Sequence, residues 1–182
     1  MPTLPAMPDR FPKDVLQSAP SMPQQWWVAR AKPRQEKKLA RWLAASKLGY
    51  FLPLRRRVRD WRGRKIRSEE PLLPGYVFLL ADNTQATRAF GSGAVAERLA
   101  VHDQVALYSE LLQVDRLCAL GRDLREQAGL VEGREVELKA GPCRGLRGVV
   151  MPGAGNARFV VRLAILGRNL EITLDPAEVE PL

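Results

Sequence analysis

The sequence predicts an α+β protein: an N-terminal α/β sandwich, in which helices flank an antiparallel sheet, followed by a small five-stranded β-barrel. Up to residue 128, apolar residues recur at helical spacing between short aromatic and β-branched runs. After residue 133 the apolar period changes from helical spacing to alternation. Gly-rich turns then separate short apolar runs at the spacing typical of a small barrel.

Residues 1–25 hold six of the 14 prolines and show no periodic pattern, which predicts a disordered extension. The opening residues lack the continuous apolar run of a signal peptide. No stretch approaches the ~18 apolar residues of a membrane span. We therefore expect a cytoplasmic protein that does not enter a membrane.

The first ordered elements are predicted to be a strand, a helix and a second strand. Residues 26–30 are aromatic and β-branched, as strands are. Pro33 suits the first turn of a helix, which we expect to run to about Lys47 and to end before Gly49. Residues 50–52 form the second strand. One face of the helix is set to pack through Leu39, Trp42, Leu43 and Ser46, and the other is cationic through Arg34, Lys37, Lys38 and Arg41.

Residues 55–67, RRRVRDWRGRKIR, contain eight basic residues and one acid. Gly63 offers a turn, so this segment predicts a β-hairpin arm that is too charged to be buried. Two interpretations of Trp61 stay open. Its indole could stack on an exposed base, or it could close the hairpin by packing on Val58 or Ile66.

The later elements are predicted from the same periods. Pro74-Gly75 precedes a buried strand at residues 76–80. Further along the chain we expect a helix within 84–90, a short strand within 94–101, a helix over 105–128, a joint at 129–133 and the barrel over 134–182.

The net charge of +9 is concentrated in one segment. Residues 26–70 hold 15 Lys and Arg against four acids, an excess of 11 positive charges, and the rest of the chain is close to neutral. Such clustering indicates a polyanionic partner, DNA or RNA, although a charged helix face can also be merely solvated.

No catalytic or metal-binding constellation is present in the sequence. Cys118 and Cys143 lack metal-ligand spacing and read as reduced thiols. His102 is the only histidine, and neither a catalytic triad nor a phosphate-binding loop can be assembled. We therefore expect no enzyme activity, no metal and no cofactor.

Two ordered sets of motifs resemble one known family, the NusG-type transcription factors. The N-terminal set, which resembles the family's N-terminal domain, is Trp27-Val28, Lys32-Pro33-Arg34-Gln35-Glu36, Phe51-Leu52-Pro53-Leu54 and Leu73-Pro74-Gly75-Tyr76-Val77-Phe78. The C-terminal set, which resembles the SH3-like KOW barrel of that family, is Gly133, Val136, Gly141-Pro142, Gly145, Gly148-Val149-Val150, Ile165-Leu166-Gly167-Arg168 and Val179-Glu180. The implied domains are residues 26–128 and 134–182, joined by a linker at 129–133.

The resemblance implies a monomer on the RNA polymerase clamp beside the non-template DNA, where it suppresses pausing. Leu73, Pro74 and Tyr76 would contact the polymerase, although the same stretch also reads as a core strand, with Phe78 inside. Many relatives carry an aromatic residue in place of Leu73. The residues expected to face non-template DNA or nascent RNA are Lys32, Arg34, Lys37, Lys38, Arg41, Arg55, Arg56, Arg57, Arg59, Arg62 and Arg64.

The barrel of this family recruits either the helicase Rho or a ribosomal protein. The resemblance places that contact at Ile165, Leu166 and Arg168. Arg168 follows the family pattern, whereas Leu166 stands where Phe is common, which leaves the identity of the partner open. A plain strand-turn-strand motif around Gly167 is the alternative.

Within the family, three features favour a specialised antitermination paralogue: the proline-rich extension, the basic arm and the short joint. A general housekeeping factor is the first alternative. A ribosome-associated or RNA-binding KOW protein is the alternative of another class, although such a protein would not need the Leu73–Phe78 signature.

Overall fold

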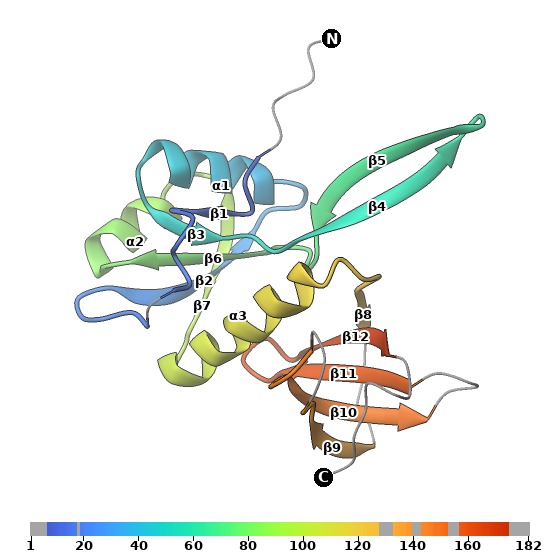
Figure 1. Cartoon of the computed structure of the whole chain (residues 1–182). Helices are drawn as coiled ribbons and strands as arrows, with labels where there is room; N and C mark the ends of the chain where they lie inside the picture. Colours follow the sequence, from blue (N-terminus) through green and yellow to red (C-terminus); the bar gives the residue numbers. More distant parts are fainter. Residues whose placement is uncertain (1–6, 18, 128–132, 140–142, 153–156, 175–182) are drawn as a thin grey trace. The chain divides into compact units, whose positions relative to one another are not determined.

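The computed structural model describes residues 7–17, 19–127, 133–139, 143–152 and 157–174. Within these residues the chain is α+β, with three helices and three antiparallel sheets (Figure 1). It divides into two compact units. The first comprises residues 1–54 and 73–108, and the second comprises residues 55–72 and 109–182.

The first unit contains a five-stranded antiparallel sheet in the order β1-β3-β6-β2-β7. The central strand β6 pairs Phe78 with Val28 on one side and with Phe51 on the other. The strands are β1 (Arg10–Phe11), β2 (Gln25–Ala31), β3 (Gly49–Phe51), β6 (Tyr76–Ala81) and β7 (Val95–Leu99). The strands predicted at 26–30, 50–52, 76–80 and within 94–101 are thereby confirmed.

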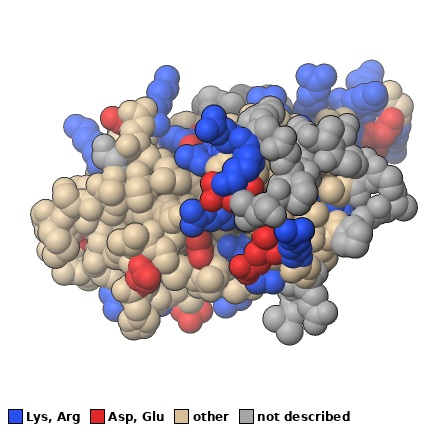
Figure 2. Space-filling model, turned by 60° about the horizontal axis from the view of Figure 1, so that its bottom comes forward, with Lys and Arg blue, Asp and Glu red and all other residues tan. Residues whose placement is uncertain are grey.

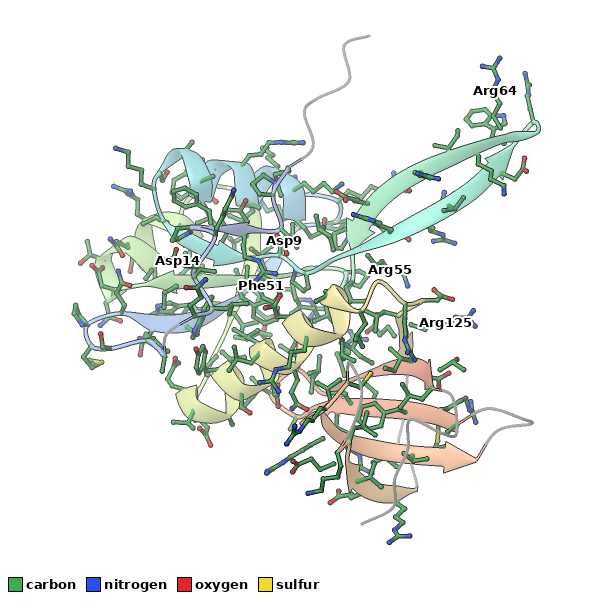
Figure 3. All side chains as sticks on the ribbon, in the orientation of Figure 1. Asp9, Asp14, Phe51, Arg55, Arg64 and Arg125 are labelled. Atoms are coloured by element: carbon green, nitrogen blue, oxygen red, sulfur yellow. The ribbon has the colours of Figure 1, made fainter. Side chains whose placement is uncertain are left out.

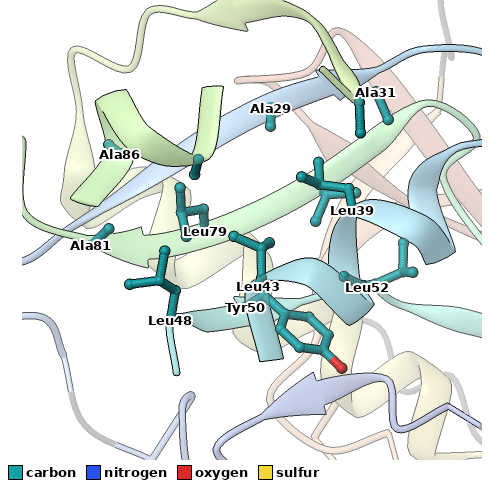
Figure 4. Packing of buried hydrophobic residues seen from close by; sticks show 14 residues of the cluster. Ala29, Ala31, Leu39, Leu43, Leu48, Tyr50, Leu52, Leu79, Ala81 and Ala86 are labelled. Atoms are coloured by element: carbon teal, nitrogen blue, oxygen red, sulfur yellow. The ribbon is translucent and has the colours of Figure 1, made fainter. Parts of the chain in front are cut away.

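Helices α1 (Glu36–Ala45) and α2 (Asn83–Phe90) pack against one face of this sheet (Figure 4). Leu39 and Leu43 of α1 are buried together with Leu79 of β6, so the predicted apolar face is confirmed. The helix begins three residues later than Pro33, because Arg34 has a left-handed φ of 61° that no α-helical residue adopts.

The other face of the sheet carries the large aromatic core. Phe51 and Phe78 are fully buried and stack with ring centroids 6.2 Å apart, which confirms the core assignment of Phe78. Trp26 lies beyond the end of β7, and there the side-chain amide of Gln104 takes the place of a neighbouring strand. The N–H of Trp26 donates to Gln104 Oε1 at 2.8 Å, and Gln104 Nε2 donates to the Trp26 carbonyl at 2.9 Å.

The N-terminal segment differs from the disordered extension expected for residues 1–25. Strand β1 adds to the edge of the sheet beside β3, and Val15 and Leu16 are buried. The Tyr50 hydroxyl donates to the Pro8 carbonyl at 2.9 Å. The few apolar residues between the prolines therefore suffice to anchor the segment, although they show no period of their own. Residues 1–6 lie outside the described part.

Helix α3 (Gln104–Ala119) is shorter than the helix predicted over 105–128. Gly121, with φ 63°, follows its end, and residues 125–127 form the edge strand β8 beside β12. Leu124 continues the helical spacing of leucines in the sequence, but it lies beyond the end of the helix and is buried there. The first residues of α3 belong to the first unit, and those from Ser109 belong to the second.

The second unit contains a five-stranded antiparallel sheet in the order β8-β12-β11-β10-β9, with β8 and β9 at its edges. Gly148 of β10 lies so close to β11 that a Cβ there would be 2.4 Å from the Val160 carbonyl oxygen. The strands are β8 (Arg125–Gln127), β9 (Arg134–Glu137), β10 (Arg147–Pro152), β11 (Ala157–Leu163) and β12 (Arg168–Leu174). The described strands do not close into the predicted barrel, and residues 129–132, Gly141-Pro142 and Val179-Glu180 lie outside the described part.

Candidate nucleic-acid interface

The segment Leu73–Tyr76 is a tight β-turn at the start of β6. The N–H of Tyr76 donates to the carbonyl of Leu73 at 3.1 Å, and Gly75 has φ 87°. Proline at the second position and glycine with positive φ at the third define a type II turn. A Cβ on Gly75 would have open space around it, so the turn requires glycine for its backbone conformation alone.

The turn is tied to the start of α1 through Glu36. The N–H of Gly75 donates to Glu36 Oε1 at 2.9 Å, and the Gly75 carbonyl accepts from the N–H of Ala31 at 2.8 Å. Only 8% of Glu36 is exposed. This role of Glu36 was not predicted from the sequence. The one indication in the sequence was that Glu36 is the single acid among the cations of residues 32–41.

The structure places the three predicted polymerase-binding residues differently from one another. Pro74 is exposed at the apex of the turn, whereas Leu73 is 1% and Tyr76 is 7% exposed. Their burial agrees with the alternative that this stretch belongs to the core. A direct partner contact by Leu73 or Tyr76 would require these side chains to become accessible.

Most of the cations predicted on and before α1 reach the surface. Lys32, Arg34, Lys38 and Arg41 are exposed, and Lys37 is half-buried. Lys32, Arg34 and Arg41 form no ion pair with any described residue. Lys38 Nζ has only the side-chain oxygen of Gln35 within reach, at 3.5 Å. Lys32, Arg34, Lys38 and Arg41 therefore remain available to phosphate groups.

The basic arm is a hairpin of two equal strands, β4 (Leu54–Trp61) and β5 (Arg64–Pro71), as predicted. Arg62 and Gly63 form its two-residue turn with φ values of 52° and 75°, which is the type I′ geometry that matches strand twist. The N–H of Gly63 donates to Asp60 Oδ1 at 2.9 Å. Figure 3 shows Arg64 near the far end of this ribbon.

The base of the hairpin carries one carboxylate among three guanidinium groups. Glu70 lies 3.3 Å from Arg55, 3.1 Å from Arg57 and 3.9 Å from Arg59. Slight burial raises the pKa of Glu70, but the hydrogen bond and charge of Arg57 and the charges of Arg55 and Arg59 outweigh it and hold that pKa below its ordinary value. Arg55 also donates to the Leu124 carbonyl at 3.4 Å, so it has a structural role.

The other cations of the hairpin have no such partners. Trp61 is 62% exposed, so packing on Val58 or Ile66 does not bury it. Within the described chain no ion pair or hydrogen bond engages the side chains of Arg56, Arg62, Arg64, Lys65 and Arg67. The hairpin therefore presents five cations that have no partner in the described chain, together with an exposed indole.

The cations of the C-terminal sheet behave differently, because carboxylates pair with several of them. Arg147 lies 3.0 Å from Glu137, and Arg162 lies 3.2 Å from Glu135. Figure 2 shows, on one face of the molecule, red and blue groups side by side in some areas and uncharged surface in others. Compensation of this kind marks a solvated surface rather than a phosphate-binding one.

The predicted partner-binding residues of the second unit lie in and beside the turn between β11 and β12. Ile165 and Leu166 are half-buried, and Arg168 pairs with Glu126 of β8 at 2.8 Å. The N–H of Ile165 donates to Glu110 of α3 at 3.2 Å. Burial raises the pKa of Glu110, and hydrogen bonds from Ile165 and Ala164 offset this only in part. Sequence reasoning missed Glu110, a single acid among the leucines of α3.

The described residues contain no cluster of three or more His, Cys, Asp or Glu side chains that could hold a metal. Cys118 is half-buried and Cys143 is buried, and neither forms a disulfide. None of the described helices has the length and apolar character that a membrane crossing requires.

A comparison with known protein families finds a match, and it covers the segment that contains the hairpin, α1 and the Leu73–Tyr76 turn. Residues 24–101 match the family model described as transcription termination factor nusG. No curated protein matches the chain closely enough to count as a relative.

Proposed function

Because residues 24–101 belong to the NusG family, we propose that the protein is an elongation and antitermination factor that suppresses pausing beside the non-template DNA. The family match itself supports the coarser statement, a transcription elongation or termination factor. Factors of this family are not enzymes and generally bind RNA polymerase. We accordingly expect the protein in the cytoplasm as a monomer.

One observation carries the nucleic-acid part of the proposal: the matched segment holds exposed cations without carboxylate partners. On α1 and the loop before it these are Lys32, Arg34, Lys38 and Arg41. Lys37, which is half-buried, stays a proposed nucleic-acid contact without belonging to this set. On the hairpin they are Arg56, Arg62 and Arg64, whereas Arg55, Arg57 and Arg59 share Glu70. Phosphate contacts of this kind give affinity without sequence preference.

We assign the polymerase contact to the Leu73–Tyr76 turn. Two hydrogen bonds from outside the turn and one within it fix its shape, so little conformational entropy is lost when a partner binds there. Pro74 supplies the exposed surface. Leu73 and Tyr76 take part if the polymerase gains access to their side chains.

For the second unit we propose a small SH3-like barrel of the KOW type. The meander of β9 to β12 supports it, because each strand pairs with its neighbour in the chain. The proposed domains remain residues 26–128 and 134–182, with 129–133 between them. Ile165, Leu166 and Arg168 would contact a ribosomal protein or Rho.

Within the family we favour a specialised paralogue over a general housekeeping factor. The supporting feature is the cationic arm, which adds exposed positive charge to the matched segment. The short joint at 129–133 does not support this choice. The expected helix would have reached residue 128, whereas α3 ends at Ala119. A ribosome-associated RNA-binding protein is the competing class, and it would use the same cations.

Binding to purified RNA polymerase from the native host tests the proposal. Pro74→Glu places a charge at the apex of the turn and should weaken binding at least several-fold. Val105→Glu is the matched control, because Val105 is 81% exposed elsewhere in the same unit and should tolerate the change. Binding to ribosomal subunits with none to polymerase would overturn the proposal in favour of the competing class.

A further inference from the structure

The hairpin β4–β5 has two chemically different faces. Alternate residues of a strand point to opposite sides, and the two-residue turn sets Trp61 opposite Arg64 and Arg59 opposite Ile66. The ion pairs of Glu70 agree with this, because they reach Arg55, Arg57 and Arg59 but none of the residues between them. One face, here called the Trp61 face, therefore carries Arg55, Arg57, Arg59, Trp61, Arg64, Ile66, Ser68 and Glu70.

The only carboxylate of the Trp61 face lies at its base. Glu70 pairs with three of the four arginines of β4, and its contact with Arg59, the outermost of the three, is the longest at 3.9 Å. Asp60, the acid nearest the turn, belongs to the opposite face and accepts the N–H of Gly63. The outer part of the face therefore presents an indole and an isoleucine between two arginines, without a negative charge.

The exposure of Trp61 is unusual among the tryptophans of this chain. Trp26 is fully buried, Trp27 and Trp42 are half-buried, and Trp61 is 62% exposed. No described aromatic ring or cation contacts its ring. A large apolar side chain left in water and surrounded by charged residues is typical of a binding surface.

We propose that the Trp61 face binds unpaired nucleotides, with a base stacked on the Trp61 indole and the neighbouring phosphates held by Arg59 and Arg64. An indole offers a flat π-face, which every base can match, and the arginines supply charge on both sides of it. A duplex hides the faces of its bases, so the site takes single-stranded DNA or RNA. This inference rests on the proposed nucleic-acid role of the arm and adds the chemical class of its ligand.

Trp61 itself supplies the first readout. Binding of short labelled oligothymidylate or oligouridylate to the full chain is measured by fluorescence anisotropy, and stacking should quench the emission of Trp61. Trp61→Ala should weaken binding by about 5- to 150-fold, the loss of one stacked base. Trp61→Phe should keep most of the affinity and remove the quenching. Val58→Ala is the control, because Val58 is 58% exposed on the opposite face, and it should change affinity less than twofold.

The second readout is the salt dependence of binding, compared between variants of Arg64 and Lys65, two neighbouring cations that lie on opposite faces of the hairpin. Arg64→Ser should reduce the salt dependence of single-strand binding by about 0.7 in the logarithmic slope, the loss of one phosphate contact. Lys65→Ser removes the same charge one residue away and should leave the slope nearly unchanged. The affinities for oligothymidylate and for oligouridylate, compared with each other, decide whether the bound strand is DNA or RNA.

The inference is overturned if Trp61→Ala binds single strands as tightly as the native chain. It is also overturned if a duplex binds as well and independently of Trp61, which would favour a β-ribbon in the major groove. Polymerase binding is measured separately. A chain that binds single strands through Trp61 but does not bind polymerase would contradict the proposed function and leave this inference standing.

Discussion

The carboxylate of Glu36 accepts a hydrogen bond from the backbone N–H of Gly75 at 2.9 Å. This bond joins the first turn of α1 to the type II turn at Leu73–Tyr76, two segments that are 39 residues apart in the chain. The cations on α1 and the exposed Pro74 are therefore held in one fixed arrangement. The shape of the proposed polymerase contact depends on a residue that does not itself reach the surface.

Glu36→Ala should destabilise the protein by about 1–3 kcal/mol, because it leaves the Gly75 N–H without its acceptor. Glu36→Gln keeps an acceptor oxygen and should cost less. Chemical denaturation measures both. Glu97→Gln serves as the control, since Glu97 forms only an exposed ion pair with Arg30, and its effect should be close to zero. Equal stability of Glu36→Ala and Glu97→Gln would show that the bond is unimportant.

Gly75→Ala should destabilise the protein by about 1–2 kcal/mol, because φ is 87° there and an L residue is strained in that conformation. Space is not the reason, since a Cβ would meet nothing within 4 Å. Gly91→Ala is the matched substitution at φ −76°, and it should be neutral or slightly stabilising. Thermal unfolding of the two variants compares them directly, and similar melting temperatures would argue against the strained turn.

These two segments also show how far the sequence could predict the site. The motif Leu73–Tyr76 and the cations on α1 are local patterns, because Pro-Gly sets a turn and helical spacing separates Leu39 and Leu43 from the charges. The bond between Glu36 and Gly75 joins segments distant in the chain, and no period of the sequence encodes such a contact. The burial of Leu73 and Tyr76 likewise depends on which chain segments cover them.

The fold shows the same division. Strands β2 and β6 and the hairpin were predicted from alternation and turn residues, and their bounds differ from the prediction by a few residues. Strand β1 was missed, because Arg10–Phe11 has too few residues to show a period and gains its stability from pairing with Phe51 and Tyr50. The end of α3 was misplaced, because Leu124 continued the apolar spacing after the backbone had left the helix.

Glu110→Gln should remove a pH dependence of stability. Burial raises the pKa of Glu110 in the folded chain, so between its unfolded and folded pKa values the folded state binds more protons. Stability is therefore highest below the unfolded pKa and falls as pH rises through the folded pKa, by about 1.4 kcal/mol for each unit of difference.

The glutamine variant keeps an oxygen that can accept from the N–H of Ile165 but does not ionise. Denaturation at a series of pH values should show it at least as stable as the native chain at neutral pH, with the difference shrinking in acid. A native-chain stability that stays flat or rises with pH across this window, relative to the variant, would contradict the assignment.

Glu70→Gln should strengthen the binding of nucleic acid to the hairpin. The carboxylate now neutralises part of the charge of Arg55, Arg57 and Arg59, and its removal frees guanidinium groups for phosphate. Each additional phosphate contact steepens the logarithmic salt slope by about 0.7 on a single strand. A titration with oligonucleotides over several salt concentrations measures this. Unchanged affinity and slope would mean that these three arginines do not face the nucleic acid.

Single-round transcription with polymerase from the native host, on a template with strong pause and terminator sites, tests the central claim most directly. The account predicts longer transcripts when the protein is added, a loss of that effect with Pro74→Glu and its retention with Val105→Glu. A response confined to certain templates would favour the specialised paralogue over the general factor. Unchanged pausing and termination on every template, with no binding to polymerase, would contradict the account.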